Sequence, residues 1–347
     1  MEITKIIKPN ILALQPYSSA RDEYTGNEGI FLDANENPYD FDHARYPDPY
    51  QRKLKVKLSE VRNVPYESIF IGNGSDEIID LLIRITCEPG EDRILSLDPS
   101  YGMYKVSAAI NKVQIDLVAM DGELNVDEYQ LNLKLKDEPK IVFICSPNNP
   151  NGGLIPQAII EQVLEKANGL VVIDEAYIDF ADTESWVSRI AEHDNLLVLQ
   201  TFSKAWAGAG LRIGMAFAQP WLVSILNKVK PPYNISSPAQ ELALERLADL
   251  PKLKASIELI KEQRKRLEIF LSQLDIVEKV FPSQANFLLA RFQDADKVME
   301  YLTAHKIIVR NRSNQNRCKS TIRISVGNQR ENDELINLLL EFQNKKS

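Results

Sequence analysis

Short apolar runs recur along the first part of the chain, and each is followed by polar residues or glycine. Runs this short, bounded by turn residues, are typical of buried strands. The predicted strands are 69–71, 93–97, 113–119, 141–145, 170–173 and 196–199, and helices are predicted between them, among others at 51–61, 78–85 and 156–168. This alternation predicts an α/β fold with a mostly parallel sheet covered by helices. In such sheets, ligands bind at the carboxyl ends of the strands.

The pattern changes after the proline-rich residues 231–234. Two predicted helices follow, at 238–250 and 252–274, with glutamate, lysine and arginine gathered on one face, most simply a solvated face. Short predicted strands then alternate with helices to the end of the chain, at 287–291, 307–310 and 321–326. This last part predicts a second, smaller α/β domain.

These changes divide the chain into three parts. We expect an irregular N-terminal arm over residues 1–39 that belongs with the small domain, a large domain over 40–248 and a small C-terminal domain over 249–347. The prolines and asparagines of the arm make a long helix improbable there. The arm either crosses a neighbouring subunit, covers a site or wraps the surface.

Candidate chemistry begins with Lys204, just after the predicted strand 196–199. A lysine in this position loses part of its hydration, which lowers its pKa and makes the neutral amine available as a nucleophile towards carbonyls. Ser203 and Arg212 flank a glycine-containing run and are suited to hold a phosphate. The alternative is a surface lysine in a flexible loop.

A second candidate stretch follows the predicted strand 170–173 and begins with Asp174 and Glu175. An aspartate at a strand end can pair with a protonated pyridine nitrogen, the partner that a pyridoxal cofactor needs. Alone, the acidic pair fits a magnesium-binding ATPase site or a solvated loop equally well. Together with Lys204, one predicted strand later, it favours pyridoxal phosphate.

A phosphate site is predicted at residues 72–77, GNGSDE, which join a strand to a helix. Such a turn offers free backbone N–H groups to an anion. The dinucleotide fingerprint GxGxxG is incomplete, because Glu77 stands where the third glycine belongs. Ser75 or Asp76 as an ordinary N-cap is compatible with phosphate binding.

Four further side chains are candidates for ligand contact. Tyr101 is placed to lay its ring on a planar cofactor, although a lone tyrosine more often packs in a core. Asn149 lies in a turn rich in proline and glycine and can donate its amide to a phenolate oxygen. Arg310 and Arg323 are either cross-strand surface residues or a clamp for an anionic substrate.

Composition excludes several classes of protein. The 347 residues are 44% apolar and 26% charged, as in an ordinary globular protein, and the net charge of -8 argues against a nucleic-acid partner. The apolar runs are too short for a membrane span or a secretion signal. Three scattered cysteines fit reduced thiols of the cytoplasm, and three distant histidines show no metal-ligand spacing.

The quoted motifs occur in the order found in a known family. The segments GNGSDE, DPSYGMY, CSPNNPNGG, VVIDEAY, TFSKAWAGAGLRIG and TIRISVG resemble fold-type I pyridoxal-phosphate-dependent aminotransferases. With LQPYSSAR, LDANENP, RYPDP and VRNRSNQNRCKSTIRISVG, the chain is similar, over nearly its whole length, to the histidinol-phosphate aminotransferases. The resemblance implies a large domain with a mostly parallel seven-stranded sheet, a smaller α/β domain, and a homodimer with shared active sites.

The resemblance also implies roles for individual residues. Lys204 would bind the cofactor covalently and move a proton during the reaction, Asp174 would pair with the ring nitrogen, and Tyr101 would stack on the ring. Tyr177 and Asn149 would bind the phenolate oxygen. The implied phosphate ligands are Gly74, Ser75, Asp76, Ser203, Arg212 and, from the neighbouring subunit, Tyr46; the implied substrate ligands are Tyr17, Asn35, Arg310 and Arg323.

The implied reaction is amino transfer between L-glutamate and imidazole-acetol phosphate, giving 2-oxoglutarate and L-histidinol phosphate in histidine biosynthesis. An aromatic amino-acid aminotransferase and a threonine-phosphate decarboxylase remain alternatives, and a cofactor-free binding protein is a third. The chain departs from the family at Asn151, because the family commonly has NPTG where this sequence has NPNG.

Overall fold

The computed structural model describes residues 5–16, 29–39 and 41–346. The strands are β1 (Ile69–Asn73), β2 (Arg93–Asp98), β3 (Gln114–Ala119), β4 (Ile141–Cys145), β5 (Leu170–Asp174), β6 (Leu196–Thr201), β7 (Ile213–Ala218), β8 (Val277–Phe281), β9 (Phe287–Phe292), β10 (Arg310–Asn311) and β11 (Thr321–Ser325). The α-helices are α1 (Pro9–Leu12), α3 (Arg52–Arg62), α4 (Gly74–Thr86), α5 (Met103–Ile110), α6 (Glu128–Leu135), α7 (Gln157–Lys166), α8 (Pro220–Val229), α9 (Ser237–Ala248), α10 (Leu250–Leu271), α11 (Ala295–Ala304) and α12 (Gln329–Lys346).

A seven-stranded sheet forms the centre of the larger part, in the order β1-β7-β6-β5-β4-β2-β3. Strands β3, β2, β4, β5 and β6 run parallel, and β7 is antiparallel to both of its neighbours. The mostly parallel, helix-covered α/β sheet predicted from the sequence is therefore confirmed. Its central strands β4, β5, β6 and β7 are buried at every residue because helices cover both faces.

Successive side chains of these strands enter two different layers of the core. In β6, Leu196 and Val198 pack with α3, α6 and α7, whereas Leu197 and Leu199 pack with α4, α5 and α8. The alternation follows from the two-residue period of a strand. Ile6 and Ile7, at the start of the chain, join the second layer, beside the large sheet.

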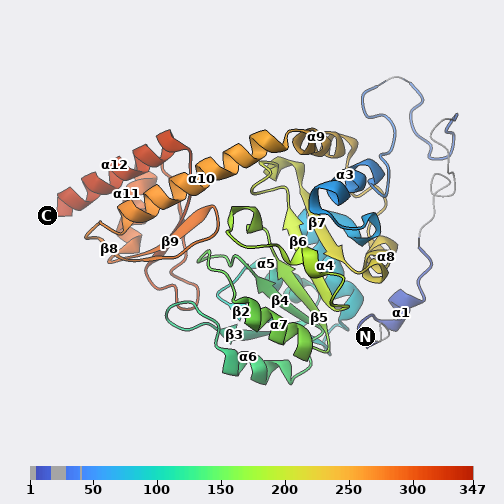
Figure 1. Ribbon diagram of the computed structural model, residues 1–347, viewed down its shortest axis with the longest axis horizontal. Coiled ribbons are helices and arrows are strands. Elements are labelled where there is room, and N and C mark those ends of the chain that lie inside the picture. The colour runs from blue at the N-terminus through green and yellow to red at the C-terminus, as the bar shows by residue number, and fades with distance from the viewer. Residues whose placement is uncertain (1–4, 17–28, 40, 347) are drawn as a thin grey trace.

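The C-terminal part contains an antiparallel sheet in the order β10-β11-β9-β8. One face packs on α11, α12 and the end of α10. The other face contributes Phe281, Phe287 and Leu289 to the core of the large sheet. Helix α10 runs from beside α9 to this small sheet (Figure 1), so one continuous helix links the two sheets.

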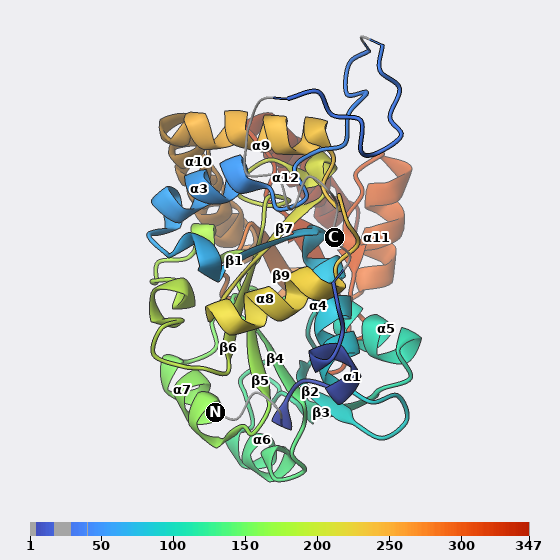
Figure 2. The same ribbon diagram turned by 90° about the vertical axis from the view of Figure 1, so that its right-hand side faces the viewer.

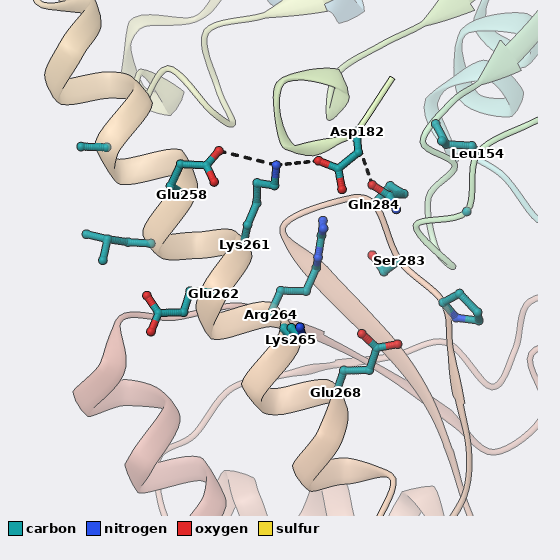
Figure 3. Close-up of a pocket in the computed structure, with 14 residues that line it drawn as sticks. Leu154, Asp182, Glu258, Lys261, Glu262, Arg264, Lys265, Glu268, Ser283 and Gln284 are labelled. Carbon is teal, nitrogen blue, oxygen red and sulfur yellow. Dashed lines mark hydrogen bonds and ion pairs between the residues drawn. The ribbon is translucent and has the colours of Figure 1, made fainter. Parts of the chain in front are cut away.

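A cleft of about 1000 Å³ lies beside α10, where the two parts of the molecule meet. Lys261 of α10 points to Asp182 of the large part, with 2.6 Å between Nζ and Oδ1, and also lies 3.5 Å from Glu258 (Figure 3). The backbone N–H of Asp182 donates to the side chain of Gln284. Lys261 and Gln284 thus each connect the C-terminal part to Asp182 of the large part.

Several elements differ from those predicted. Strand β7 directly follows the glycine-containing run after Lys204, where the sequence predicts no strand. Strand β8 and helices α5, α6, α8, α11 and α12 also have no predicted bounds. Helix α4 begins at Gly74 instead of residue 78, so Ser75 and Asp76 lie in its first turn and Asn73 is its N-cap. Strand β10 is confined to Arg310–Asn311 because the residues before it leave helix α11 through a turn.

Candidate active site

A cavity of about 160 Å³ lies at the carboxyl ends of β4, β5 and β6, beside the first turn of α4. Cys145 and Asp174 are register partners at the ends of adjacent parallel strands, and Lys204 follows β6. Predicted site residues meet at this cavity, which is lined by Ser75, Asp76, Tyr101, Cys145, Asn149, Asp174, Ala176, Tyr177, Thr201, Ser203, Lys204, Ala209 and Arg212.

Asp174 lies at the floor of the cavity and is only 3% exposed. Tyr104 donates its hydroxyl hydrogen to Asp174 Oδ2 over 2.7 Å, and the backbone N–H of Ala176 donates to Oδ1. Burial nevertheless raises the pKa of Asp174, because these two donors compensate only part of the lost hydration. A cation bound against this carboxylate would favour its charged form, so the site suits a protonated ring nitrogen.

Lys204 faces the cavity from the turn after β6, with its Nζ 5.7 Å from the centre of the Tyr177 ring. Loss of hydration and the positive charge of Arg323 lower the pKa of Lys204, and Asp174 acts in the opposite direction. A larger fraction of the amine is therefore neutral at a given pH than for a fully solvated lysine. This is the state that attacks a carbonyl or accepts a proton.

The first turn of α4 forms a cradle with β7 and Arg212. Gly74 has a φ of +76°, and a Cβ added there would lie 2.6 Å from Arg212 Nη2. A Cβ on Gly214 would lie 2.3 Å from the backbone of Gly74 and Ser75. Because no side chain caps α4, its first N–H groups remain available to an anion, with Arg212 beside them.

Hydroxyl groups complete this cradle. Thr201 donates its hydroxyl hydrogen to Ser203 Oγ over 3.0 Å, and Arg212 Nη1 lies 3.4 Å from the same oxygen. Tyr101 donates to Asp76, whose other carboxylate oxygen is 3.7 Å from Arg212. Backbone N–H groups, hydroxyls and one guanidinium together fit a phosphate.

Asn149 connects the cavity to the small sheet. Arg323 Nη1 donates to Asn149 Oδ1 over 2.6 Å, so the Asn149 amide N–H₂ is left to donate into the cavity. Beside it, Tyr177 is 6% exposed, and burial raises the pKa of its hydroxyl. A donor amide and a neutral phenol fit an anionic oxygen on a ligand ring.

Asn151, where the sequence departs from the family pattern, is 6% exposed. Its Oδ1 accepts a hydrogen bond from Asn148 Nδ2 over 2.8 Å. Gly152 follows with a φ of +77° and lies against Ser283 of the small part. The asparagine is thus an internal hydrogen-bonding residue of the turn and leaves Asn149 in place.

Other predicted residues lie away from this cavity within the single chain. Tyr46 is half exposed and stacks on Tyr233, with ring centres 4.5 Å apart. Asn35 is exposed with a φ of 55°, in the segment that projects from the body of the molecule (Figure 2). Arg310 is exposed beside Arg323, and Tyr17 lies outside the described residues.

The structure adds residues that the sequence analysis did not single out. Tyr104, one helical turn after Tyr101, holds Asp174 and is buried against the Phe143 ring at 4.6 Å. Arg312 lies near Tyr177 and Arg323, as their mutual charge effects show. The spacing of Tyr101 and Tyr104 and of Arg310 and Arg312 is visible in the sequence, but only the fold shows that Tyr104 meets Asp174 and that Arg312 lies near Tyr177.

Within the described ranges, no group of three or more His, Cys, Asp and Glu side chains is placed to hold a metal ion. Across the same ranges, every helix is too short or too polar to span a membrane.

The family of class I and II aminotransferases matches residues 40–339, and the chain belongs to this family. A histidinol-phosphate aminotransferase from Cytophaga hutchinsonii is 50% identical over 344 residues, which cover 98% of this chain and 99% of that relative. The solved histidinol-phosphate aminotransferase from Clostridium acetobutylicum has a TM-score of 0.82 at 27% identity, covering 88% of this chain and 92% of that chain.

The Sinorhizobium meliloti histidinol-phosphate aminotransferase, solved in complex with pyridoxal-5'-phosphate, has the same fold. Its TM-score is 0.80 at 24% identity, and the match covers 88% of this chain and 85% of that chain. The fold is thus that of the fold-type I pyridoxal-phosphate-dependent aminotransferases, as the sequence predicted.

Proposed function

We propose that the protein uses pyridoxal 5'-phosphate to transfer an amino group between L-glutamate and imidazole-acetol phosphate. The products are 2-oxoglutarate and L-histidinol phosphate, in histidine biosynthesis. The observation that carries this function is that Asp174 and Lys204 line one cavity and that Arg323 is bonded to Asn149, which also lines it. The chain is similar to histidinol-phosphate aminotransferases over 98% of its length.

The cavity residues fit the cofactor in three places. The first turn of α4, Ser203 and Arg212 would hold the phosphate, and Asp174 would hold the ring nitrogen. Asn149 and Tyr177 would hold the phenolate oxygen. When bound, the cofactor withdraws electrons from the carbon that carries the amino group. Tyr104 keeps the Asp174 carboxylate oriented towards the cavity throughout.

Lys204 would supply the covalent attachment and then act as the acid and base. Its lowered pKa leaves more neutral amine to take a proton from the substrate carbon, and Asp174 stabilises the ammonium form that results. Proton transfer by a positioned side chain contributes about 10²- to 10⁴-fold to a rate.

Arg323 would bind the anionic end of either substrate. Its guanidinium is held by Asn149 on one side and lies 5.2 Å from the centre of the Phe287 ring on the other. A planar guanidinium matches both a carboxylate and a phosphate, so one arginine can serve glutamate and histidinol phosphate in alternate half-reactions.

We further propose a homodimer in which Tyr46 reaches the cofactor phosphate of the partner. Support comes from the N-terminal stretch that precedes Tyr46, drawn in blue, which projects from the body of the molecule (Figures 1 and 2). Its apolar side chains are strongly exposed, at 91% for Ile30, 84% for Leu32, 74% for Tyr39 and 66% for Phe41. A run of exposed apolar side chains is typical of a protein interface. We place the protein in the cytoplasm, in agreement with its three free cysteines.

The function is tested by following one half-reaction through the absorbance of the cofactor. The purified holoenzyme is mixed separately with L-histidinol phosphate, L-phenylalanine and threonine phosphate. We expect rapid loss of the starting absorbance with histidinol phosphate. A faster reaction with phenylalanine would instead indicate an aromatic aminotransferase, and carbon dioxide release from threonine phosphate would indicate a decarboxylase.

A further inference from the structure

Three arginines lie on one face of the small sheet. Arg310 of β10 is the register partner of Arg323 of β11, so their side chains point to the same face. The N–H of Arg312 donates to the carbonyl oxygen of Thr321, which continues the pairing two residues further along both chains. Because side chains alternate along a strand, Arg312 belongs to the same face as Arg310 and Arg323.

No carboxylate in the described part of the chain forms an ion pair with any of these three arginines. The Nε atoms of Arg312 and Arg323 are both buried and have no hydrogen-bond partner among the described residues. Burial and the charges of Arg323 and Arg310 lower the pKa of Arg312 to about 10. Unpaired donors and like charges at close range are unfavourable, and a bound anion would relieve both.

The turn that follows β10 adds two more buried polar atoms without partners, Ser313 Oγ and Gln315 Oε1. Buried polar atoms are normally hydrogen-bonded, so a group of them beside unpaired arginines indicates a place for a polar ligand. The Arg312 side chain therefore lies among buried polar atoms that a ligand could satisfy.

Two of these arginines, Arg323 and Arg312, lie beside residues that line the reaction cavity. Arg323 is bonded to Asn149, which lines the cavity. The charges of Arg323 and Arg312 both act on the hydroxyl of Tyr177, another lining residue, and each counteracts the rise of its pKa. Arg312 thus lies on the same sheet face as Arg323, beside the cavity residue Tyr177.

We propose that Arg312 makes this site selective for a phosphate-bearing substrate by supplying a guanidinium that a carboxylate does not use. This inference rests on the proposed function and deepens it. A phosphate monoester carries a charge of about -1.5 to -2 at neutral pH and three acceptor oxygens, whereas a carboxylate carries a single charge and two oxygens. Arg323 suffices for a carboxylate, and the additional charge and oxygen of a phosphate are matched by Arg312.

The test compares two simple anions on the holoenzyme, in which the cofactor already fills its own phosphate cradle. Inorganic phosphate and glutarate are titrated calorimetrically into the wild type and into Arg312→Gln. We expect the dissociation constant for phosphate to rise roughly 10- to 100-fold, as for loss of a charge-assisted hydrogen bond. The dissociation constant for glutarate should change less than about 3-fold.

Arg317→Gln is the matched control, because Arg317 is exposed in the same turn and its replacement removes the same charge. It should leave both dissociation constants nearly unchanged. Arg312→Lys keeps the charge without the planar fork and should recover part of the phosphate affinity. Circular dichroism and thermal unfolding establish that each variant is folded, and Arg312→Lys provides the comparison if Arg312→Gln is unstable.

The proposal would be overturned if Arg312→Gln weakened the binding of phosphate and glutarate equally, or if it weakened the binding of neither. A wild-type holoenzyme that binds glutarate but not phosphate would also overturn it. The proposed function is judged separately by the half-reaction of the wild type. If phosphate binding depends on Arg312 but L-histidinol phosphate does not react, the function is wrong and the phosphate selectivity stands.

Discussion

At the scale of single residues, Asp174 and Lys204 lie at one cavity, and burial favours the neutral form of each. It raises the pKa of the aspartic acid and lowers the pKa of the lysine. A cationic ring nitrogen would return Asp174 to its charged form, and a carbonyl would react with the neutral amine of Lys204. Asp174 and Lys204 therefore suit a single ligand that carries both a cationic ring nitrogen and a carbonyl.

Replacing Lys204 with alanine tests this pairing. We expect Lys204→Ala to lose the absorbance band of the lysine-bound cofactor and to slow amino transfer by about 10²- to 10⁴-fold or more, because the acid and base are removed. Absorbance spectra and steady-state rates measure the two effects. Lys319→Ala, at an exposed position, should behave as the wild type. Normal turnover in Lys204→Ala would exclude this mechanism.

Glu175, next to Asp174, predicts a pH dependence of stability. It is 1% exposed and accepts hydrogen bonds from Ser185, Trp186 and Gln200, yet burial raises its pKa from 4.5 to about 7. The folded state therefore holds this proton more tightly than the unfolded state, and the contribution to stability falls as the pH rises from about 4.5 to about 7.

In Glu175→Gln this ionisation is removed. We expect the loss of stability between pH 5 and pH 7.5 to be smaller in the variant than in the wild type, by roughly 2–3 kcal/mol. Urea unfolding at the two pH values measures the difference. The same dependence in both proteins would show that Glu175 does not titrate in this range.

At the scale of elements, the first turn of α4 is shaped by its glycines. Gly74 adopts a left-handed φ, and the space that a Cβ would take is filled by Arg212. The N-terminus of the helix can thus approach β7 and the guanidinium closely enough to form one anion site. Strand, turn and helix each contribute to this cradle, and none of them forms it alone.

Gly74→Ala is expected to raise the dissociation constant for pyridoxal 5'-phosphate by at least about 10-fold, since Arg212 must move to admit the methyl group. Gly90→Ala is the matched control. Gly90 has a φ of +82°, but its Cβ would come no closer than 3.7 Å to Lys112. Both variants should lose about 1 kcal/mol of stability from the unfavourable φ, and only Gly74→Ala should lose cofactor affinity. Fluorescence titration of the apoenzyme measures the affinity, and equal affinity in the two variants would contradict the cradle.

At the scale of the whole molecule, the site is assembled from both parts of the chain. The large sheet supplies Asp174 and Lys204, and the small sheet supplies Arg323, which contacts Asn149 of the large part. Contacts along α10, including the ion pair of Lys261 with Asp182, join these two parts (Figure 3). If Tyr46 completes the site of a partner, the functional unit is a pair of chains.

Mixed dimers test this unit. Lys204→Ala and Tyr46→Ala protomers, each of low activity, are unfolded together and refolded as a mixture at limiting cofactor. A dimer with one protomer of each kind has one site with both residues intact, so random mixing should recover about a quarter of the wild-type activity. If Tyr46 acted within its own chain, mixing would restore nothing.

The sequence by itself determined the alternation of strands and helices, because apolar periodicity depends only on local order along the chain. It also placed Asp174 and Lys204 after the apolar runs 170–173 and 196–199, which became the central strands β5 and β6. Strand β7 was not predicted because its apolar residues directly follow a glycine-containing loop. The start of α4 was not predicted because Gly74 is a poor helix former.

Only the tertiary structure decided which polar side chains share a site. Tyr104 meets Asp174 across 70 positions of the chain, and Arg323 meets Asn149 across 174. Such contacts depend on the order of strands in the sheet and on the docking of the small sheet, neither of which is a local property of sequence. The docking of the small sheet decides whether Arg312 and Arg323 face solvent or the cavity. It therefore also decides which anions the site can bind.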